Sequence, residues 1–288
     1  MASVSVLALR RRDRPLGRRR RPRVRAVAIA VLAVVVLACL VAPLVARYDP
    51  TALAPADAFA RASGEHWFGT DNLGRDLFAR VVYGGRISLG VAGGATVVSM
   101  LVGCLWGFVA ALRRGIADEV LMRLADVAMA IPQMLLALVL VAAFGASAPG
   151  LALIIGLLLV PVTARLVRSA VLGETEAEYY SAAVAYGASR RRLVFGEVLP
   201  NVAAPLGVQA AINAANAIVL EAALSFVGLG VQPPDASWGT LLQQGYEQMY
   251  QSLSGVIFPA VPIFVTIWML NLLADELGGV DDLRGRTG

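Results

Sequence analysis

Lysine is absent from this 288-residue chain, so all 25 of its basic residues are arginine. A Walker A loop needs a lysine that reaches the β- and γ-phosphates of a nucleotide, so the chain cannot form an ATP site of that kind. It also has only one histidine, His66, and two cysteines, Cys39 and Cys104. Because a structural zinc site takes four nitrogen or sulfur ligands, these three residues cannot form a conventional zinc site. We predict no metal site, no cofactor bound by this chain and no catalytic residues.

Long apolar runs are abundant instead. Hydrophobic residues make up 58% of the sequence, against about 45–50% in an ordinary soluble domain. A helix needs about 20 apolar residues to cross a hydrocarbon core of about 30 Å. We predict an all-α membrane protein with six transmembrane helices. They fall at 26–46, 88–112, 127–147, 149–170, 203–228 and 253–274. Pro132 is expected to kink the third, and Arg165 and Arg168 to end the apolar part of the fourth.

Arginine is distributed unevenly along the chain, and ten arginines precede the first apolar run. Such a block holds the N-terminus in the cytoplasm. Six crossings then place both termini there and leave five arginines outside. Those five are Arg47, Arg61, Arg75, Arg80 and Arg86. An arginine-rich tail can also bind nucleic acid or anionic lipid, but orientation is the simpler interpretation, and we expect no nucleic-acid partner.

The predicted organisation follows from these spans. An Arg-rich cytoplasmic tail (1–25) precedes the first transmembrane helix (26–46) and an extracytoplasmic segment (47–86). A core domain with five transmembrane helices (87–275) and a second cytoplasmic tail (276–288) complete the chain. Within the outer segment, Leu73, Leu77 and Arg80 recur at helical spacing, which predicts an amphipathic element lying on the outer membrane surface.

A polar loop, 174–201, separates the fourth and fifth spans on the cytoplasmic side. Glu178, Ala182 and Ala185 have helical spacing and predict a short helix. Gly187 is its expected end, because glycine adopts positive φ without a Cβ clash.

Ser189 is the expected N-cap of a second short helix, 190–198, which Pro200 would close. By physical argument alone, this loop could also be an ordinary one whose arginines only set topology.

The fifth span carries polar residues. Gln209, Asn213 and Asn216 share one helix face, and such amides either join helices by hydrogen bonds or line a wet path. Glu221 lies off this face. An ionisable residue in a span normally faces protein or water, so we predict a tie to a partner or to the outer segment, with Arg75 or Arg86 as its mate.

Four stretches resemble one family. They are Gly69–Asp76, the Asp118 to Pro132 region, the loop with Ala182, Ala183, Gly187 and Leu199-Pro200, and Leu224–Gly230 followed by Pro233-Pro234 and Ser237–Gly239. The chain is similar to the dipeptide/oligopeptide/nickel permeases of ABC importers, which are binding-protein-dependent inner membrane components, in the branch that pairs with a second related permease. Ser181 and Glu197 depart from the family pattern, which often has Glu and His there.

The resemblance implies a type I ABC importer permease fold in a prokaryotic cell membrane, importing di- or oligopeptides. Its expected partners are a second permease, two cytoplasmic ATPases that bind ATP and Mg, an extracytoplasmic binding protein and the lipid bilayer. The ATPase-coupling residues would be Glu178, Ala182, Ala183, Gly187, Ser189, Arg190, Leu199 and Pro200. The structural or interface residues would be Asp71, Arg75, Asp76, Arg86 and Glu221.

Three alternatives stay open at this point. The same architecture could import nickel or another small solute. An ion-coupled secondary transporter would need buried carboxylates in symmetry-related broken helices, and only Glu221 fits that description. A membrane enzyme would need a nucleophile, base or metal cluster at depth, and the sequence contains none.

Overall fold

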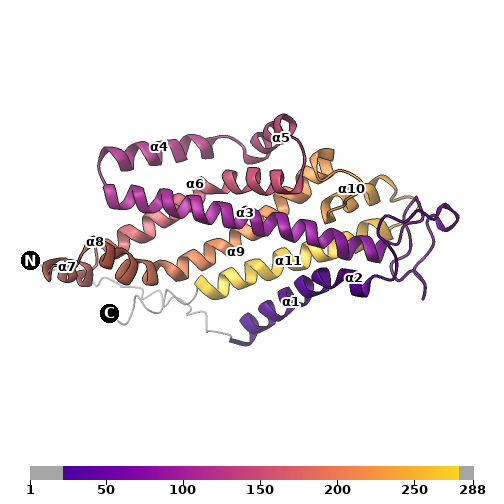
Figure 1. The fold of residues 1–288 in the computed structure, drawn as a ribbon, viewed down its shortest axis with the longest axis horizontal. Helices are drawn as coiled ribbons and strands as arrows, with labels where there is room; N and C mark the ends of the chain where they lie inside the picture. The colour runs from indigo at the N-terminus through magenta and orange to yellow at the C-terminus, as the bar shows by residue number, and fades with distance from the viewer. Residues whose placement is uncertain (1–21, 279–288) are drawn as a thin grey trace, which may run out of the picture.

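The computed structural model describes residues 22–278, which form an elongated bundle of helices (Figure 1). Five long helices run along its length: α1 (Pro22–Leu40), α3 (Leu77–Arg113), α6 (Ala148–Thr175), α9 (Leu199–Leu224) and α11 (Ser254–Gly278). The shorter elements are α2 (Ala42–Val45), η1 (Pro55–Asp57), α4 (Ile116–Ala130), α5 (Gln133–Phe144), α7 (Glu178–Ala185), α8 (Arg190–Arg192), η2 (Leu193–Val198), η3 (Ser225–Leu229) and α10 (Trp238–Glu247). The predicted tails lie mostly outside the described residues.

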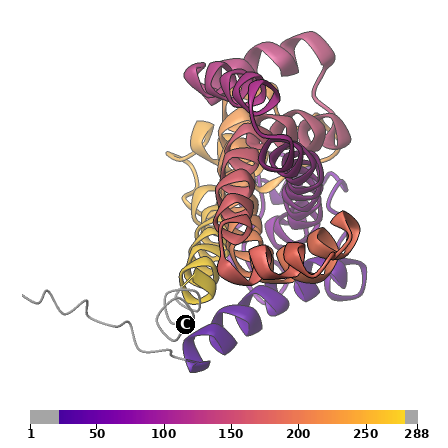
Figure 2. The ribbon, with the colours of Figure 1, turned by 90° about the vertical axis from the view of Figure 1, so that its left-hand side faces the viewer.

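Five helices among residues 22–278 are long and apolar enough to cross a membrane, and the bent pair α4–α5 makes six if it counts as one span. On that count the prediction of an all-helical protein with six spans is confirmed. The pair lies on the opposite side of the bundle from α1 (Figure 2). Helices α3, α6, α9 and α11 therefore form the centre, with α1 and the bent pair at its flanks.

The third predicted span, 127–147, is not one continuous helix. Its two halves, α4 and α5, meet at 86°. Ile131 is extended, with ψ 129°, because the ring of the following Pro132 disfavours helical backbone at the residue before it. The proline therefore breaks the span, where the sequence predicted only a kink, and α4 begins eleven residues earlier than the predicted start of the span.

Two ion pairs attach α4 to α6. The Nη2 of Arg168 donates to Asp118 Oδ2 at 2.6 Å, and Arg165 pairs with Asp126. The carboxylates are two turns apart on α4, and the arginines are about one turn apart on α6. With their charges compensated, the arginines do not end α6, which continues to Thr175. The sequence predicted that they end only the apolar part of this span, and the helix continues five residues beyond the predicted end at 170.

Helix α3 begins well before its predicted start at 88. Asp76 caps it, because its Oδ1 accepts from the backbone N–H of Ala79 at 2.7 Å. The helix has 37 residues and is therefore about 55 Å long, much longer than a hydrocarbon core of about 30 Å. Leu77 and Arg80 are buried in its first turns, so the prediction of a separate amphipathic element on the membrane surface is wrong.

Small residues let α3 approach α6 closely. Along α3 they recur every four residues, at Ala95, Ser99, Gly103, Gly107 and Ala111, and all five are buried. A Cβ added to Gly107 would lie 2.6 Å from the backbone oxygen of Ala164. Such small-residue stripes allow membrane helices to pack by van der Waals contact between backbones.

Replacing Gly107 with Ala should destabilise the protein. The new methyl group would meet backbone that cannot move aside without separating α3 from α6, and overpacking of this kind costs about 1–3 kcal/mol. Thermal unfolding in detergent micelles would measure the loss. Gly93 is the matched control on the same helix, because a Cβ added there has nothing within 4 Å. Equal melting temperatures for Gly107→Ala and Gly93→Ala would contradict the assigned contact.

Candidate functional site

The candidate coupling loop, 174–201, forms the short helix α7 and a bend. Helix α7 runs from Glu178 to Ala185, with Glu178 in its first turn, where a negative charge suits the helix dipole. Gly187 has φ +80°, and Ser189 caps the next helix, its Oγ accepting from the backbone N–H of Arg192 at 3.4 Å. The predicted helix, its end at Gly187 and the cap at Ser189 are confirmed.

The second predicted helix, 190–198, does not stop at Pro200. After the single turn of α8, the chain forms the π-helical segment η2 and runs directly into α9. Pro200 lies in the first turn of α9, directly after the π-helical turn, in which the N–H of Leu199 donates to the carbonyl oxygen of Val194 five residues earlier. The prediction that Pro200 closes the helix is therefore wrong, and Leu199 and Pro200 begin the next span.

Two tyrosines fasten α7 to the bundle. Tyr180 packs against an apolar cluster formed by residues of α3, α6, η2 and α9. The hydroxyl of Tyr179 donates to Glu174 at the end of α6 and accepts from Asn201 Nδ2 at 3.1 Å at the start of α9. Partial burial and the hydrogen bond to Glu174 raise the pKa of Tyr179 to about 12, so the phenol keeps its proton at neutral pH and bridges the two helices.

Arg190 joins this segment to α3. Its Nη2 donates to the carbonyl oxygen of Leu112 at 3.2 Å, near the end of α3. Arg114 donates to Thr175 Oγ1 at 3.1 Å, which links the ends of α3 and α6. The loop is thus attached to α3, α6 and α9 together, and a force applied to it would reach all three.

The outer face of α7 is open. Ala182 and Val184 are exposed, Ala183 is half-buried, and the side chain of Tyr186 is 92% exposed. A cleft of about 360 Å³ lies beside this helix, between Leu112, Thr175 and Ser181. The loop therefore presents a small, mainly apolar projection at one end of the bundle, on the left in Figure 1.

The amides of α9 separate into two groups. Gln209 Nε2 donates to Asn213 Oδ1 at 2.7 Å, and Asn213 Nδ2 donates to Ser99 on α3 and Thr163 on α6, both at 2.9 Å. These two side chains are buried and join three helices. Asn216 is exposed, so its side chain is available to a path or to another subunit.

Glu221 is completely buried, and its partners are serines. Its Oε2 accepts from Ser88 at 3.0 Å and its Oε1 from Ser225 at 2.7 Å. The prediction that Arg75 or Arg86 pairs with it is wrong. Arg75 binds Asp71, and the guanidinium of the exposed Arg86 lies 5.9 Å from the centre of the Tyr83 ring. Glu221 ties elements of this chain to one another.

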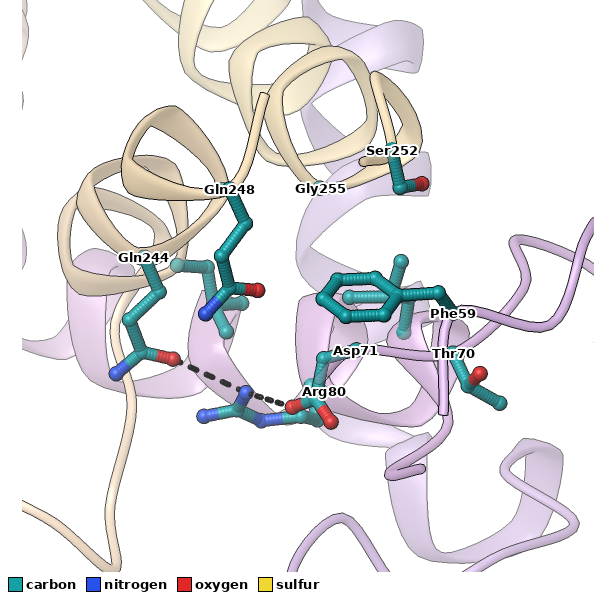
Figure 3. Close-up of a pocket in the computed structure, with 11 residues that line it drawn as sticks. Phe59, Thr70, Asp71, Arg80, Gln244, Gln248, Ser252 and Gly255 are labelled. Carbon is teal, nitrogen blue, oxygen red and sulfur yellow. Dashed lines mark hydrogen bonds and ion pairs between the residues drawn. The ribbon is translucent and has the colours of Figure 1, made fainter. Parts of the chain in front are cut away.

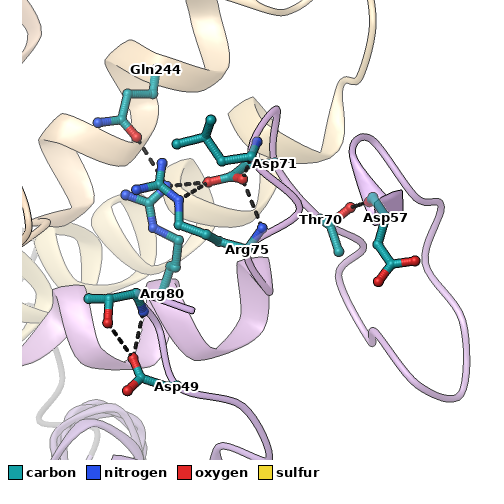
Figure 4. A network of polar contacts seen from close by, with 9 residues as sticks. Asp49, Asp57, Thr70, Asp71, Arg75, Arg80 and Gln244 are labelled. Carbon is teal, nitrogen blue, oxygen red and sulfur yellow. Dashed lines mark hydrogen bonds and ion pairs between the residues drawn. The ribbon is translucent and has the colours of Figure 1, made fainter. Parts of the chain in front are cut away.

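The opposite end of the bundle is organised by Asp71. Its Oδ2 accepts from Arg75 Nε at 2.7 Å and from Arg80 Nη1 at 2.6 Å. Arg80 Nη1 also donates to Gln244 of α10 at 3.1 Å, so the segment before α3, α3 itself and α10 meet at one buried guanidinium (Figure 4).

The cavity beside this network is small. Arg80 lies between Asp71 and Gln244 at its edge, with Phe59 and Gln248 nearby (Figure 3). Its volume is about 20 Å³, which holds about one water molecule. The Asp71 network therefore joins elements of the fold around a water-sized cavity, and a larger cleft of about 290 Å³ lies on another side of Arg80, beside Tyr83 and Arg86.

Asp76 and His66 make a second contact there. His66 Nδ1 lies 2.9 Å from Asp76 Oδ2, while the other oxygen of Asp76 caps α3. In the described part of the chain, no three His, Cys, Asp or Glu side chains are placed to hold a metal ion. The structural roles expected for Asp71, Arg75 and Asp76 agree with these contacts, although their part in any interface stays a prediction.

Sequence reasoning missed Tyr179 and the small-residue stripe of α3. The stripe was readable as Gly103 and Gly107 with small residues four positions away on either side. Tyr179 left no comparable signal, because its partners Glu174 and Asn201 come together only when α6 and α9 pack.

Known proteins resemble this chain in sequence and in fold. The family described as "Binding-protein-dependent transport system inner membrane component" matches residues 99–279. A putative peptide transport system permease protein of Brucella suis is 38% identical, over 88% of this chain and 85% of its own length.

Two further relatives are each 36% identical over 85% of this chain. They are the di/tripeptide transport system permease protein DppC of Pseudomonas aeruginosa, covered to 83%, and the oligopeptide transport system permease protein OppC of Bacillus subtilis, covered to 81%.

A solved structure shares the fold. The inward-facing MetNI methionine ABC transporter contains a chain that aligns with TM-score 0.57 and 17% identity, over 72% of this chain and 96% of that one. With an identity this low, the likeness concerns the arrangement of helices only. The family match and the relatives together settle the classification: this chain belongs to the inner membrane components of binding-protein-dependent transport systems.

Proposed function

We propose that this chain is one of two permease subunits that together enclose the path of an ATP-driven importer of di- or oligopeptides. The observation that carries the proposal is α7, a short exposed helix fastened to α3, α6 and α9. The named functions of the relatives from Pseudomonas aeruginosa and Bacillus subtilis support a peptide substrate. Import of nickel or another solute by the same architecture remains the alternative.

Charge supports placing α7 in the cytoplasm. Arg113, Arg114 and Arg190–Arg192 gather at this end of the bundle, and cytoplasmic loops carry an excess of arginine. Both termini would then be cytoplasmic, in a prokaryotic inner membrane, and the end with Asp71 would face a binding protein outside. Because the chain has no lysine, two separate ATPase subunits would bind ATP and Mg and dock on α7.

The attachments of α7 suggest how the ATPases would act on the path. When ATP draws the ATPases together, α7 would move with them. Tyr179 would carry that movement to α6 and α9, and Arg190 would carry it to α3. Helices joined in this way shift as rigid bodies, which is how a domain movement switches access from one side to the other.

Asn216 is the residue we assign to the path. It is exposed on α9, one turn from the buried Asn213 that joins α3, α6 and α9. A polar side chain on an apolar span is tolerated where it faces protein or water. We therefore place Asn216 at the seam with the second permease, with Gln209 and Asn213 supporting it from behind.

Co-purification tests the assembly. The full-length chain, tagged and extracted in mild detergent, should bring down an ATPase and a second, related permease. Mass spectrometry of the purified complex identifies both. Recovery of homo-oligomers alone would refute the proposed subunit role, whatever the solute.

Replacing Gly187 with Val should abolish uptake of labelled peptide while leaving the chain in the membrane. The backbone there has φ +80°, which a β-branched residue adopts only with strain, so the bend after α7 would change. Gly187→Asn is the matched control, since asparagine tolerates this conformation and a Cβ has open space at this position. Normal uptake by the Val variant, with unchanged ATP hydrolysis, would contradict coupling through α7.

Asn216 and Asn213 should differ when each is replaced with Leu. Asn216→Leu should lower peptide uptake and leave the melting temperature near that of the wild type. Asn213→Leu should lower the melting temperature, because Ser99, Thr163 and Gln209 would lose a partner inside the bundle, at about 1–3 kcal/mol for a buried group left unsatisfied. Unchanged uptake by Asn216→Leu would remove this residue from the path.

A further inference from the structure

Glu221 is a fully buried carboxyl group that has no basic partner among residues 22–278. It lies in the last turn of α9, and its contacts in the described part of the chain are hydroxyl groups. A charged group in an apolar span is costly unless other groups compensate it. The protonation state of Glu221 therefore depends on how the surrounding hydrogen bonds are directed.

The first hydrogen-bond chain runs through Ser88. The backbone N–H of Trp238 donates to Ser88 Oγ at 3.0 Å, and a backbone N–H can only donate. Ser88 Oγ lies 3.0 Å from Glu221 Oε2, so its own hydrogen is available to point at the carboxylate. Ser88 thus relays a hydrogen bond from α10 to Glu221: its oxygen accepts from the backbone N–H of Trp238, and its hydrogen is donated to Glu221 Oε2.

The second chain runs through Ser237 and Ser225. The N–H of Thr240 donates to Ser237 Oγ at 3.2 Å. Ser237 Oγ lies 3.3 Å from Ser225 Oγ, which lies 2.7 Å from Glu221 Oε1. Either serine can be the donor in this contact; when Glu221 is a carboxylate, the single hydrogen of Ser225 serves it, and Ser237 is then the donor to Ser225. Both carboxylate oxygens therefore receive hydrogens directed from α10.

The two chains begin in the first turn of the same helix. Trp238 and Thr240 are its first and third residues, and the N-terminus of a helix carries a positive partial charge of about half an elementary charge. The same end is held to α3 by the Trp238 indole, whose Nε1 donates to the carbonyl oxygen of Val81 at 2.9 Å. A neutral acid at position 221 would have to donate, which would leave one serine hydrogen without an acceptor.

We propose that Glu221 is ionised, that the N-terminus of α10 balances its charge through the two serine chains, and that this pairing positions α10 against α3 and α9. Gln244 and Arg80 then hold the middle of α10 to α3. Helix α10, with ten residues, is too short to cross the membrane. Because these contacts hold it to α3 and α9, it would move with them as one unit. The inference does not depend on which solute is transported.

The charge state is tested by infrared difference spectroscopy on the purified full-length chain in detergent. In the spectrum of wild type minus Glu221→Gln, the two stretching bands of a carboxylate should appear, because only the wild type has this group. If the carbonyl stretch of a protonated acid appears in their place, the proposal is overturned. If Glu221→Gln does not accumulate in the membrane, wild type minus Ser225→Ala serves instead. Removal of one donor should shift the carboxylate bands, and a shifted acid carbonyl band would overturn the proposal.

The positioning role is tested by thermal unfolding. Glu221→Gln should lower the melting temperature by several degrees, because an amide N–H₂ would face a serine hydrogen, while the exposed Glu65→Gln should not change it. Ser225→Ala should cost less in the Glu221→Gln background than in the wild type, since interacting residues are non-additive. A Glu221→Gln variant as stable as the wild type, or strict additivity, would contradict the pairing.

Discussion

The close contact between α3 and α6 is the constraint on which the rest of the bundle depends. Gly103 and Gly107 allow the two backbones to touch, because side chains of any size would separate them. Within lipid the hydrophobic effect does not drive helices together, so such van der Waals contact is a main source of association. Once α3 and α6 are fixed, Ser99 and Thr163 lie within reach of Asn213, and α9 takes its place.

Charged groups in the apolar helices are compensated locally. Arg80 is matched by Asp71, on the segment just before α3, and Arg168 by Asp118 on α4. Removing an ion from water costs several kcal/mol or more unless a partner offsets it. This explains why arginines can lie inside continuous helices, and why α3 and α6 are longer than their apolar stretches.

Part of the fold and of the candidate site was readable from the sequence because its causes are local. Apolar runs of spanning length located the helices, glycine marked the bend at Gly187, and the serine hydroxyl at Ser189 marked a cap. The prediction that the second helix of the loop ends at Pro200 was wrong, because a proline can end the helix before it and can also lie in the first turn of the helix that follows. Only the π-helical continuity of η2 with α9 decides between these outcomes.

The sequence by itself determined that this is a helical membrane protein without a Walker A nucleotide site, because hydrophobicity, helix length and the absence of lysine are properties of the chain alone. Tertiary structure decided the partners of its polar groups. The sequence predicted an arginine partner for Glu221, but its carboxyl oxygens accept hydrogen bonds from Ser88 and Ser225. Tyr179 gained a role only when Glu174 and Asn201 came together. Hydrogen bonds and ion pairs act over a few ångströms in space, so packing, and not sequence position, selects them.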